Sequence, residues 1–361
     1  MTEKASSACR IRSLPLIAWP EADRLAWTAA CRPGQRFGTG GRAWHLAPVT
    51  RADLARRYGY YLDFLDRALA LERDAPPAAL VTPDSIAAFV SELQERVRSV
   101  TVSGTIYKVR RMAECLAPAR NFGWLAEIGK DLAMLARPRC KFQRVVMTER
   151  LVEAGLTLMH DADLQVNSAP FRRAVMARNG LMLALLALCP IRLRNYAALE
   201  IGRSFVYVDG TWWIELRDTK SGRPDQRPVP TFLTAFVERY LRMYRPILAR
   251  SAIDGARNAA VPIGPVKALW VGYLGAPLGY AAVQRAVTET TRSTMGVPIS
   301  PHLFRAAAAT SAAFYAPQSP DLASALLQHA DPRVTEAHYI RASSLSVAGD
   351  FTALIRRLKN G

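Results

Sequence analysis

The 361-residue sequence lacks most of the features that mark secreted, metal-binding or membrane proteins. None of its five cysteines belongs to a C-x-x-C pair, which argues against a disulfide framework and a zinc site and predicts reduced thiols. The apolar run over residues 181–189 is too short to cross a bilayer and predicts a buried helix. Prolines break the apolar stretch 14–19, so it does not resemble a signal peptide. These absences predict a cytoplasmic protein that does not bind a membrane.

Nucleotide and nicotinamide chemistry have no visible basis either. The sequence contains no G-x-x-x-x-G-K-[ST] phosphate loop and no glycine fingerprint of a dinucleotide-binding fold. No metal and no organic cofactor are therefore expected. The composition, 50% hydrophobic and 22% charged, is that of a chain that folds, and its length suits two domains.

Positive charge is what the sequence has in excess. Its 48 basic and 30 acidic residues leave a formal net charge of +18, which favours a polyanionic partner, nucleic acid before an acidic membrane surface. Basic residues outnumber acidic ones by 7 to 3 in residues 1–46, by 16 to 11 in 47–145 and by 25 to 16 in 146–361. Only 7 of the basic residues are lysine. This preference for arginine suits bidentate contact with phosphate, and codon usage in a GC-rich genome explains it equally well.

Apolar residues at three- and four-residue spacing predict a compact helical domain over residues 47–136. Its first helix is expected from Thr50, which with Asp53 is typical of an N-terminal capping pair. Three further helices are expected from Thr82 onward, near residues 101–116 and near residues 122–135. Residues 1–46 are rich in tryptophan and glycine, predict one helix near 21–31, and are interpreted as an N-terminal extension of this domain.

The basic, proline-containing stretch 137–145 predicts a linker to a second domain over residues 146–361. Helices are expected there over 148–160 and 170–188. The apolar period then changes to two, so 205–208 and 211–216 predict a hairpin around an Asp-Gly turn, followed by a third strand over 227–230. After Thr231 the spacing is helical. The predicted fold is mainly α with a small three-stranded sheet.

Two segments of the second domain carry isolated basic residues at the ends of predicted elements. Arg192 follows Pro190, which ends one helix, and precedes the apolar face of the next. Alone, it fits a surface arginine at a helix start. Lys220 lies in the turn between the second and third strands, where a mobile ammonium can reach a ligand, although a solvated turn lysine fits the same position.

Two later segments add histidines, an arginine and a tyrosine. Ser300-Pro301 predicts the start of a helix whose first turn carries His302 and Arg305 on one face. Free N–H groups and the positive dipole end make such a turn suited to an anion, and a capped helix with an incidental His and Arg is the equal alternative. The last segment places His329 at a helix end and Tyr339 ten residues later.

Taken in this order, the segments resemble the tyrosine recombinase (phage integrase) family. Each piece is weak alone, but the order of six residue types within one domain is specific. The pieces are residues 191–193, 219–222, 301–305, and 326–329 with Tyr339. Residues 47–136 are similar to the family's core-binding domain, less specifically. The chain departs from the usual pattern at Gln328, where glycine is usual, at Asn195, where an acidic residue is common, and in a His329–Tyr339 spacing that is one residue longer.

The resemblance implies a site-specific recombinase or integrase that cleaves and rejoins DNA through a 3′-phosphotyrosine intermediate, without metal or ATP. It implies an all-helical core-binding domain followed by an α+β catalytic domain. The implied roles are Tyr339 as nucleophile, Arg192 and Arg305 as clamps on the phosphate oxygens, Lys220 as general acid, His302 as base or proton relay, and His329 as a hydrogen-bond donor to the phosphate.

The implied partners are double-stranded DNA and further copies of the chain, in a tetramer on two synapsed sites. Accessory DNA-bending proteins and sister recombinases also accompany such enzymes. The expected setting is the bacterial cytoplasm, at the nucleoid when the enzyme acts on a mobile genetic element. Integration, excision, inversion and transposon mobility all remain open. The basic residues expected to contact DNA are Arg110, Arg111, Arg137, Arg139 and Lys141.

Two other functions fit parts of the same pattern. A type IB topoisomerase-like relaxing enzyme shares the chemistry but does not need two domains and an apolar C-terminal tail. A non-catalytic DNA-binding regulator on the same scaffold has no reason to keep six catalytic residue types. The tail itself carries apolar residues at helical spacing and packs either on its own domain or on a neighbouring copy; they are Phe351, Leu354, Ile355 and Leu358.

Overall fold

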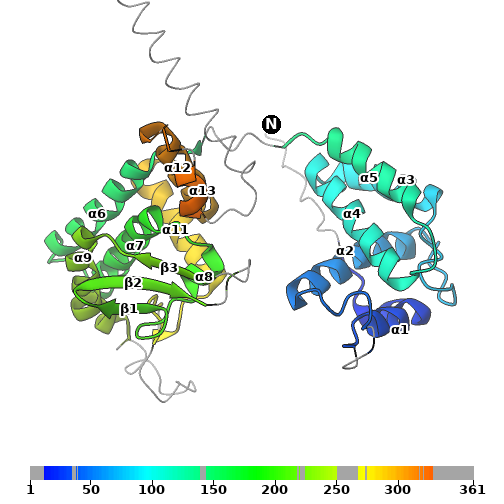
Figure 1. Cartoon of the computed structure of the whole chain (residues 1–361), viewed down its shortest axis with the longest axis horizontal. Coiled ribbons are helices and arrows are strands. Elements are labelled where there is room, and N and C mark those ends of the chain that lie inside the picture. The colour runs from blue at the N-terminus through cyan, green and yellow to red at the C-terminus, as the bar shows by residue number, and fades with distance from the viewer. Residues whose placement is uncertain are drawn as a thin grey trace, which may run out of the picture. The chain divides into compact units, whose positions relative to one another are not determined.

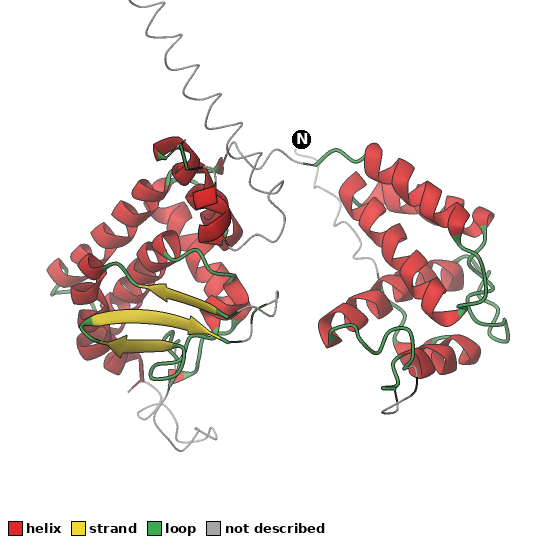
Figure 2. Cartoon of the chain, in the orientation of Figure 1, coloured by secondary structure: helices red, strands yellow, loops and turns green. Residues whose placement is uncertain are grey.

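The computed structural model describes residues 12–34, 38, 40–138, 144–217, 219, 224–249, 267–272, 275–316, 318–319 and 321–327. Within these ranges the chain is mainly helical and carries one three-stranded antiparallel sheet, which confirms the predicted fold class (Figure 1; Figure 2). The chain divides into two compact units, Met1–Arg139 and Cys140–Gly361. Among the described helices, none combines the length and apolar character needed to cross a membrane.

The N-terminal unit is a helical bundle around an aromatic core. Tyr58, Tyr61 and Phe89 are fully buried, and the ring centroids of Tyr61 and Phe89 lie 5.3 Å apart in an edge-on arrangement. A 3-10 turn (Leu16–Ala18) precedes the helices. They are α1 (Glu21–Ala30), α2 (Pro48–Arg67), α3 (Pro83–Arg96), α4 (Ser99–Leu116) and α5 (Gly123–Met134).

Two helix starts in this unit test the expected capping signals. At α3, the Ser85 N–H donates to the Thr82 hydroxyl at 3.3 Å and the Thr82 N–H donates back to the Ser85 hydroxyl at 3.1 Å, a complete capping box. The prediction that α2 begins from a Thr50 cap is wrong. Pro48 is its first residue, because the fixed φ of proline suits the first helical turn, and Ala47 precedes it without a side-chain cap.

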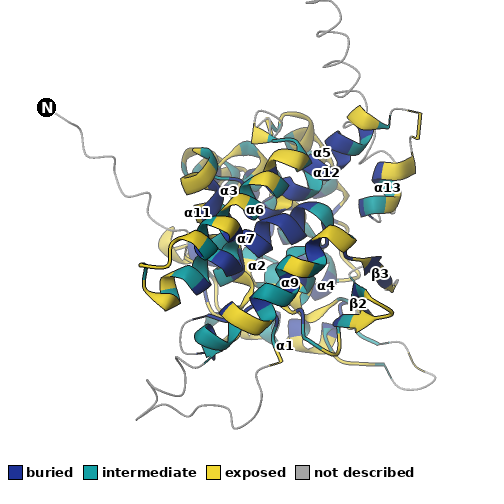
Figure 3. Cartoon of the chain, turned by 90° about the vertical axis from the view of Figure 1, so that its left-hand side faces the viewer, coloured by how far each residue is buried: buried dark blue, intermediate teal, exposed yellow. Residues whose placement is uncertain are grey.

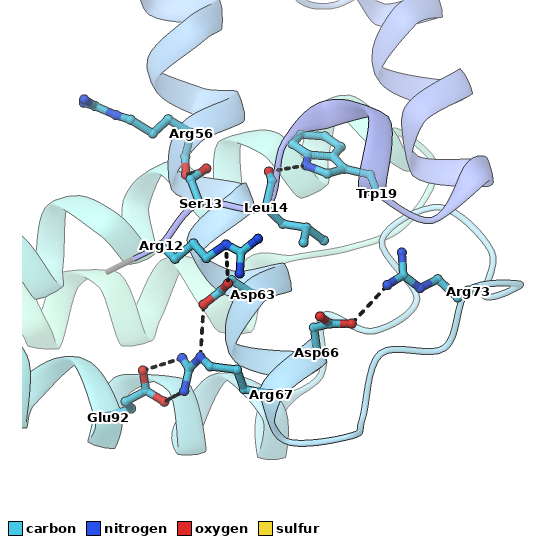
Figure 4. A network of polar contacts seen from close by, with 10 residues as sticks. All are labelled: Arg12, Ser13, Leu14, Trp19, Arg56, Asp63, Asp66, Arg67, Arg73 and Glu92. Atoms are coloured by element: carbon cyan, nitrogen blue, oxygen red, sulfur yellow. Dashed lines mark hydrogen bonds and ion pairs between the residues drawn. The ribbon is translucent and has the colours of Figure 1, made fainter. Parts of the chain in front are cut away.

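The N-terminal segment packs into the same core. The Leu14 N–H donates to the Gly59 carbonyl of α2 at 2.9 Å. The Trp19 indole donates to the Leu14 carbonyl at 3.0 Å (Figure 4). In α1, the buried Asp23 carboxylate accepts bonds from the Tyr58 hydroxyl and the Ala78 N–H, both at 2.7 Å. Further buried apolar side chains of this segment are Trp27, Ala30 and Ala43.

The second unit is built around α7 (Pro170–Leu188), which is buried along most of its length (Figure 3). Helix α6 (Thr148–Leu164) packs on it so closely that a Cβ on Gly155 would lie 2.6 Å from the Gly180 carbonyl oxygen. The remaining helices are α8 (Leu193–Ala197), α9 (Thr234–Arg239) with a π-helical continuation (Tyr240–Tyr244), α11 (Tyr280–Met295), α12 (Pro301–Tyr315) and α13 (Asp321–Leu327).

The sheet has the strand order β1-β2-β3, with β1 (Phe205–Val208) and β2 (Thr211–Leu216) at the predicted bounds. Asp209 and Gly210 between them both have positive φ, 48° and 81°, as a two-residue hairpin turn requires. The third strand, β3 (Asp225–Pro228), begins two residues before the predicted one, since Asp225 pairs with Leu216 and Pro228 with Trp213. This register turns Asp225 and Arg227 toward the buried side.

The expectation of helical structure everywhere after Thr231 is also wrong. Ala268 forms an antiparallel bridge with Glu200, and Val271 forms one with Pro277. These short extended pieces lie against the core, where Trp270 is fully buried and its indole N–H donates to the Tyr196 carbonyl at 3.0 Å.

Candidate active site

Arg305 lies where three segments of the second unit meet. It occupies the first turns of α12, which begins at Pro301 as predicted from Ser300-Pro301, and His302 is exposed on the same turn. One guanidinium nitrogen of Arg305 donates to the Pro190 carbonyl, and the other donates to the Leu327 carbonyl at 2.6 Å. The side chain therefore ties the start of α12 to the segment before α8 and to the end of α13.

Arg192 is brought to the same place by the segment before α8. It is the residue before the first turn of α8, with extended backbone angles of −66° and 136°, and its side chain is half-buried. It follows Pro190, whose carbonyl binds Arg305, by two residues. Burial lowers the pKa of Arg305, and the nearby positive charge of Arg192 lowers it further.

A third arginine, Arg227 of β3, lies buried beside them. Its guanidinium makes two bonds to the Asp225 carboxylate, at 2.8 and 2.9 Å, and its remaining terminal nitrogen donates to the Leu326 carbonyl at 2.7 Å. Arg227 and Arg305 thus hold two consecutive carbonyls at the C-terminal end of α13. Free carbonyls at a helix end carry partial negative charge, which explains why cations gather there.

Positive charge exceeds negative charge around the Arg305 guanidinium. Burial, then the nearby charges of Arg192 and Arg227, lower the pKa of Arg305 to about 10, while Asp225 opposes them. The guanidinium remains protonated at neutral pH, in a setting that penalises its charge. An anion placed beside Arg192 and Arg305 would relieve this penalty, and a phosphate oxygen matches guanidinium geometry. The cluster can therefore bind a phosphate group.

Cys189 lies next to the arginine cluster without being suited to nucleophilic chemistry. Its sulfur is 3.9 Å from the Pro228 carbonyl oxygen, and burial raises the pKa of its thiol to about 12. A thiol with this pKa is protonated at neutral pH, so it is a poor nucleophile. Within the described residues, no group of three or more His, Cys, Asp or Glu side chains is arranged to hold a metal ion.

The structure places some of the sequence-predicted site residues and not others. Arg192 and Arg305 come together, and His302 lies on the same helical turn as Arg305. Lys220, His329 and Tyr339 lie outside the described residues. Along the chain, however, Lys220 falls between β2 and β3, and His329 follows the end of α13 by two residues.

The residues expected to contact DNA are placed in part. On α4, Arg110 donates to Glu114 at 3.0 Å, and Arg111 forms an ion pair with the same carboxylate at 3.8 Å. Arg137 is exposed, and its backbone N–H donates to the Ser99 hydroxyl at 2.9 Å. Arg139 and Lys141 lie outside the described residues.

Sequence reasoning missed Asp225 and Arg227, whose ion pair lies beside the candidate site. The available signal was their spacing: two residues of opposite charge at positions i and i+2 of a strand share one face. Because Val229 and Pro230 were assigned to the strand, Asp225 was placed in the preceding turn instead.

Comparisons with known proteins concern the fold. No family model matches the chain, and no curated protein matches its sequence. Among solved structures it is similar to XerA recombinase, with 14% identity over 82% of this chain and 89% of that one, at a TM-score of 0.36. It is also similar to a lambda integrase(75-356) dimer bound to a COC′ core site, with 13% identity over 82% of this chain and 90% of that one, at a TM-score of 0.51. The resemblance seen in the motifs is thus confirmed at the level of the fold, and the chain has the fold of the tyrosine recombinases and integrases.

Proposed function

We propose that the chain is a site-specific DNA recombinase or integrase that cleaves and rejoins DNA through a 3′-phosphotyrosine intermediate. The observation that carries this proposal is the arginine cluster. Arg192 and Arg305 come from separate segments, and burial and mutual repulsion lower the pKa of Arg305. Such an arrangement is stabilised by a phosphodiester, whose transition state gains negative charge on the non-bridging oxygens that two guanidinium groups can bind.

The proposed chemistry needs only groups of this chain. The Tyr339 hydroxyl oxygen attacks phosphorus and passes its proton to His302 or to water. The bond from phosphorus to the 5′ oxygen breaks, and Lys220 protonates that leaving oxygen. The ester with tyrosine conserves the energy of the broken bond. A DNA 5′ hydroxyl can therefore reverse the reaction and rejoin the strand without ATP.

The end of α13 supports the role proposed for His329. The Leu327 carbonyl binds Arg305, and Leu327 precedes His329 by two residues. Along the chain, His329 is therefore the second residue after the helix end that Arg305 contacts. An imidazole from that position can donate a hydrogen bond to a phosphate held by Arg192 and Arg305.

Double-stranded DNA is the proposed substrate. The net charge of +18 is spread over both units, and the lambda integrase dimer of similar fold was crystallised on a core site. We assign phosphate-positioning roles to basic residues of the N-terminal unit and the linker, namely Arg110, Arg111, Arg137, Arg139 and Lys141. A bacterial enzyme acting at the nucleoid on a mobile element fits this substrate.

A second copy of the chain is the proposed protein partner, in a tetramer on two DNA sites. An apolar hollow of about 750 Å³ opens between α6, α12 and α13, lined by Leu156, Ala312 and Leu326 among others. The apolar tail residues of a neighbouring copy, at positions 351–358, match the apolar lining of this hollow.

Deleting residues 346–361 should abolish assembly of synapsed DNA complexes while leaving binding to a single site intact. Unchanged assembly in native gels would remove this proposal.

A trapping experiment tests the enzymatic proposal directly. The wild-type chain is incubated with DNA from the flanks of its own gene, nicked so that the cleaved end diffuses away, and covalent protein–DNA adducts are separated under denaturing conditions. Wild type should form the adduct at a defined position, and Tyr339→Phe should not, although it binds the DNA comparably. An adduct with the Phe variant would place the nucleophile elsewhere, and binding without any wild-type adduct would favour a non-catalytic regulator.

A plasmid assay separates the recombinase from a relaxing enzyme. A recombinase should join two plasmids only when both carry the mapped cleavage site. Relaxation of supercoiled plasmids that lack this site, with no joined product from plasmids that carry it, would favour the type IB topoisomerase-like alternative.

A further inference from the structure

We propose that Arg227, held by Asp225, is a positioning residue for DNA cleavage: it fixes the end of α13 and thereby sets the orientation of Arg305. This inference rests on the proposed function. It assigns a role in the reaction to two buried charges that belong to none of the matching motif pieces.

The contacts of Arg227 leave its guanidinium little freedom. Two of its nitrogens bind the two oxygens of Asp225, and the third binds the Leu326 carbonyl. Asp225 and Arg227 share the buried face of β3, so the carboxylate fixes the plane of the guanidinium. Because the Asp225 carboxylate neutralises its charge, Arg227 is less suited than Arg192 or Arg305 to bind a phosphate itself.

The contact with Leu326 connects this pair to the phosphate site. The next carbonyl along the chain, that of Leu327, accepts a bond from Arg305. Because two consecutive carbonyls are bound by guanidinium groups from β3 and α12, the position of one depends on the other. Release of Leu326 would let the end of α13 shift, and the Arg305 guanidinium would lose its fixed partner. The chain also leaves this helix end toward His329.

This arrangement separates a positioning role from a purely electrostatic one. A charge at residue 227 lowers the pKa of Arg305, and any cation there would do the same. Holding the carboxylate and the carbonyl together requires the planar fork of arginine, which an ammonium group does not reproduce. Lysine at this position should therefore fail to replace arginine.

The central experiment measures the rate constant and the amplitude of covalent adduct formation at saturating protein. Arg227→Gln and Arg227→Lys should each lower the rate constant about 10- to 100-fold, because a displacement of about 1 Å costs a factor of this size. DNA affinity should change less than about threefold, as expected for a residue with no contact to phosphate. A variant that merely folds less completely loses amplitude and keeps its rate constant.

Two further variants keep the test interpretable. Asp225→Asn/Arg227→Gln removes both charges, avoids a lone buried carboxylate, and should show the same loss of rate. The matched control is Arg242→Gln, which removes one positive charge from an exposed ion pair with Glu238 on the same helical stretch and should leave the rate constant unchanged. A rate restored by Arg227→Lys to within about twofold of wild type would overturn the positioning role in favour of simple charge.

Hydrogen exchange provides a readout that does not depend on catalysis. Arg227→Gln should raise amide exchange in the peptide covering α13, and Arg242→Gln should not. Unchanged exchange in α13 would overturn the inference while leaving the proposed recombinase function intact. Absence of an adduct from wild type would instead overturn the proposed function, and with it the role of Arg227 in cleavage.

Discussion

Arg67 and Arg73 of the N-terminal unit are held differently from Arg305 of the second unit. In the N-terminal unit, Arg67 bridges Asp63 at 3.0 Å and Glu92 at 2.7 Å, and Arg73 binds Asp66 at 3.0 Å (Figure 4). In the second unit, Arg305 donates to two backbone carbonyls instead. A carboxylate cancels the charge of an arginine, whereas a carbonyl satisfies its hydrogen bonds and leaves the charge in place.

Carbonyl contacts alone do not mark an anion site, since Arg120 of the N-terminal unit also donates to the backbone carbonyls of Ala78 and Val81. Arg305 differs because the positive charges of Arg192 and Arg227 act on it as well. Buried charges are normally paired, so guanidinium groups that lie close together favour an anion beside them. Composition cannot make this distinction, because both kinds contribute equally to the net charge of +18. Substitution of a carboxylate-paired arginine and of an arginine near Arg305 should therefore have different effects in solution.

The largest difference is expected in catalysis. Arg192→Gln should lower the rate constant for adduct formation about 10²- to 10³-fold, the usual effect of removing one group that stabilises transition-state charge. Arg67→Gln, which removes the same charge from a carboxylate pair, should leave this rate constant unchanged. Single-turnover trapping on nicked DNA measures both. Equal losses in the two variants would show that the pairing pattern does not separate functional from structural arginines.

The next effect concerns stability and the buried carboxylate of the N-terminal unit. Tyr58→Phe removes one of the two donors to Asp23, and an unsatisfied buried acceptor costs about 1–3 kcal/mol. Burial already raises the pKa of Asp23, so the carboxylate has little solvent to replace the lost bond. Urea unfolding of the variant should show this loss. Tyr60→Phe on the same helix keeps the ring near Arg57 and serves as the control, with an expected change below about 0.5 kcal/mol.

Much of the fold was predictable because most elements bury one regular stripe of side chains. The bounds of α7, β1 and β2 agree with the prediction from apolar spacing, and the Asp209-Gly210 turn follows from residues that tolerate positive φ. The predicted bounds were wrong where a polar contact, and not apolar burial, decides which side chains face the core. The third strand was misplaced because its inward side chains are Asp225 and Arg227, which are stable there only as a pair.

The candidate site was predictable at the level of residue types and not of contacts. Order and spacing suggested Arg192 and Arg305 as candidates, and the structure places Arg192 near enough for its charge to act on Arg305. Their partners are the backbone carbonyls of Pro190 and Leu327, which every residue type can supply. No sequence pattern therefore indicates them, and the same holds for the contact between Arg227 and Leu326.

A smaller effect should appear when the carboxylate that pairs with Arg67 is titrated. Hydrogen bonds from Arg67 and Arg96 lower the pKa of Glu92 below its ordinary value of 4.5. The stability from this group is therefore present above about pH 4.5 and is lost as the pH falls through the lower, folded-state pKa. Between about pH 6 and pH 3.5, the unfolding free energy of wild type should fall by up to about 1 kcal/mol more than that of Glu92→Gln, because the pairs are partly exposed. Equal decreases would mean that these pairs contribute nothing measurable.

The smallest expected effect concerns the salt dependence of DNA affinity, which reports on the arginines proposed to contact DNA phosphates. Each phosphate contact that is lost should reduce the slope of log K against log salt by about 0.9. Arg137→Gln should show this reduction, because its exposed side chain can reach a phosphate without leaving a buried partner. Arg110→Gln should show a smaller one, since Glu114 already binds the Arg110 guanidinium. Fluorescence anisotropy at several salt concentrations measures both slopes. Equal reductions would mean that carboxylate pairing does not keep an arginine from serving DNA, and the contrast between the two kinds of arginine would then hold only for the buried site around Arg305.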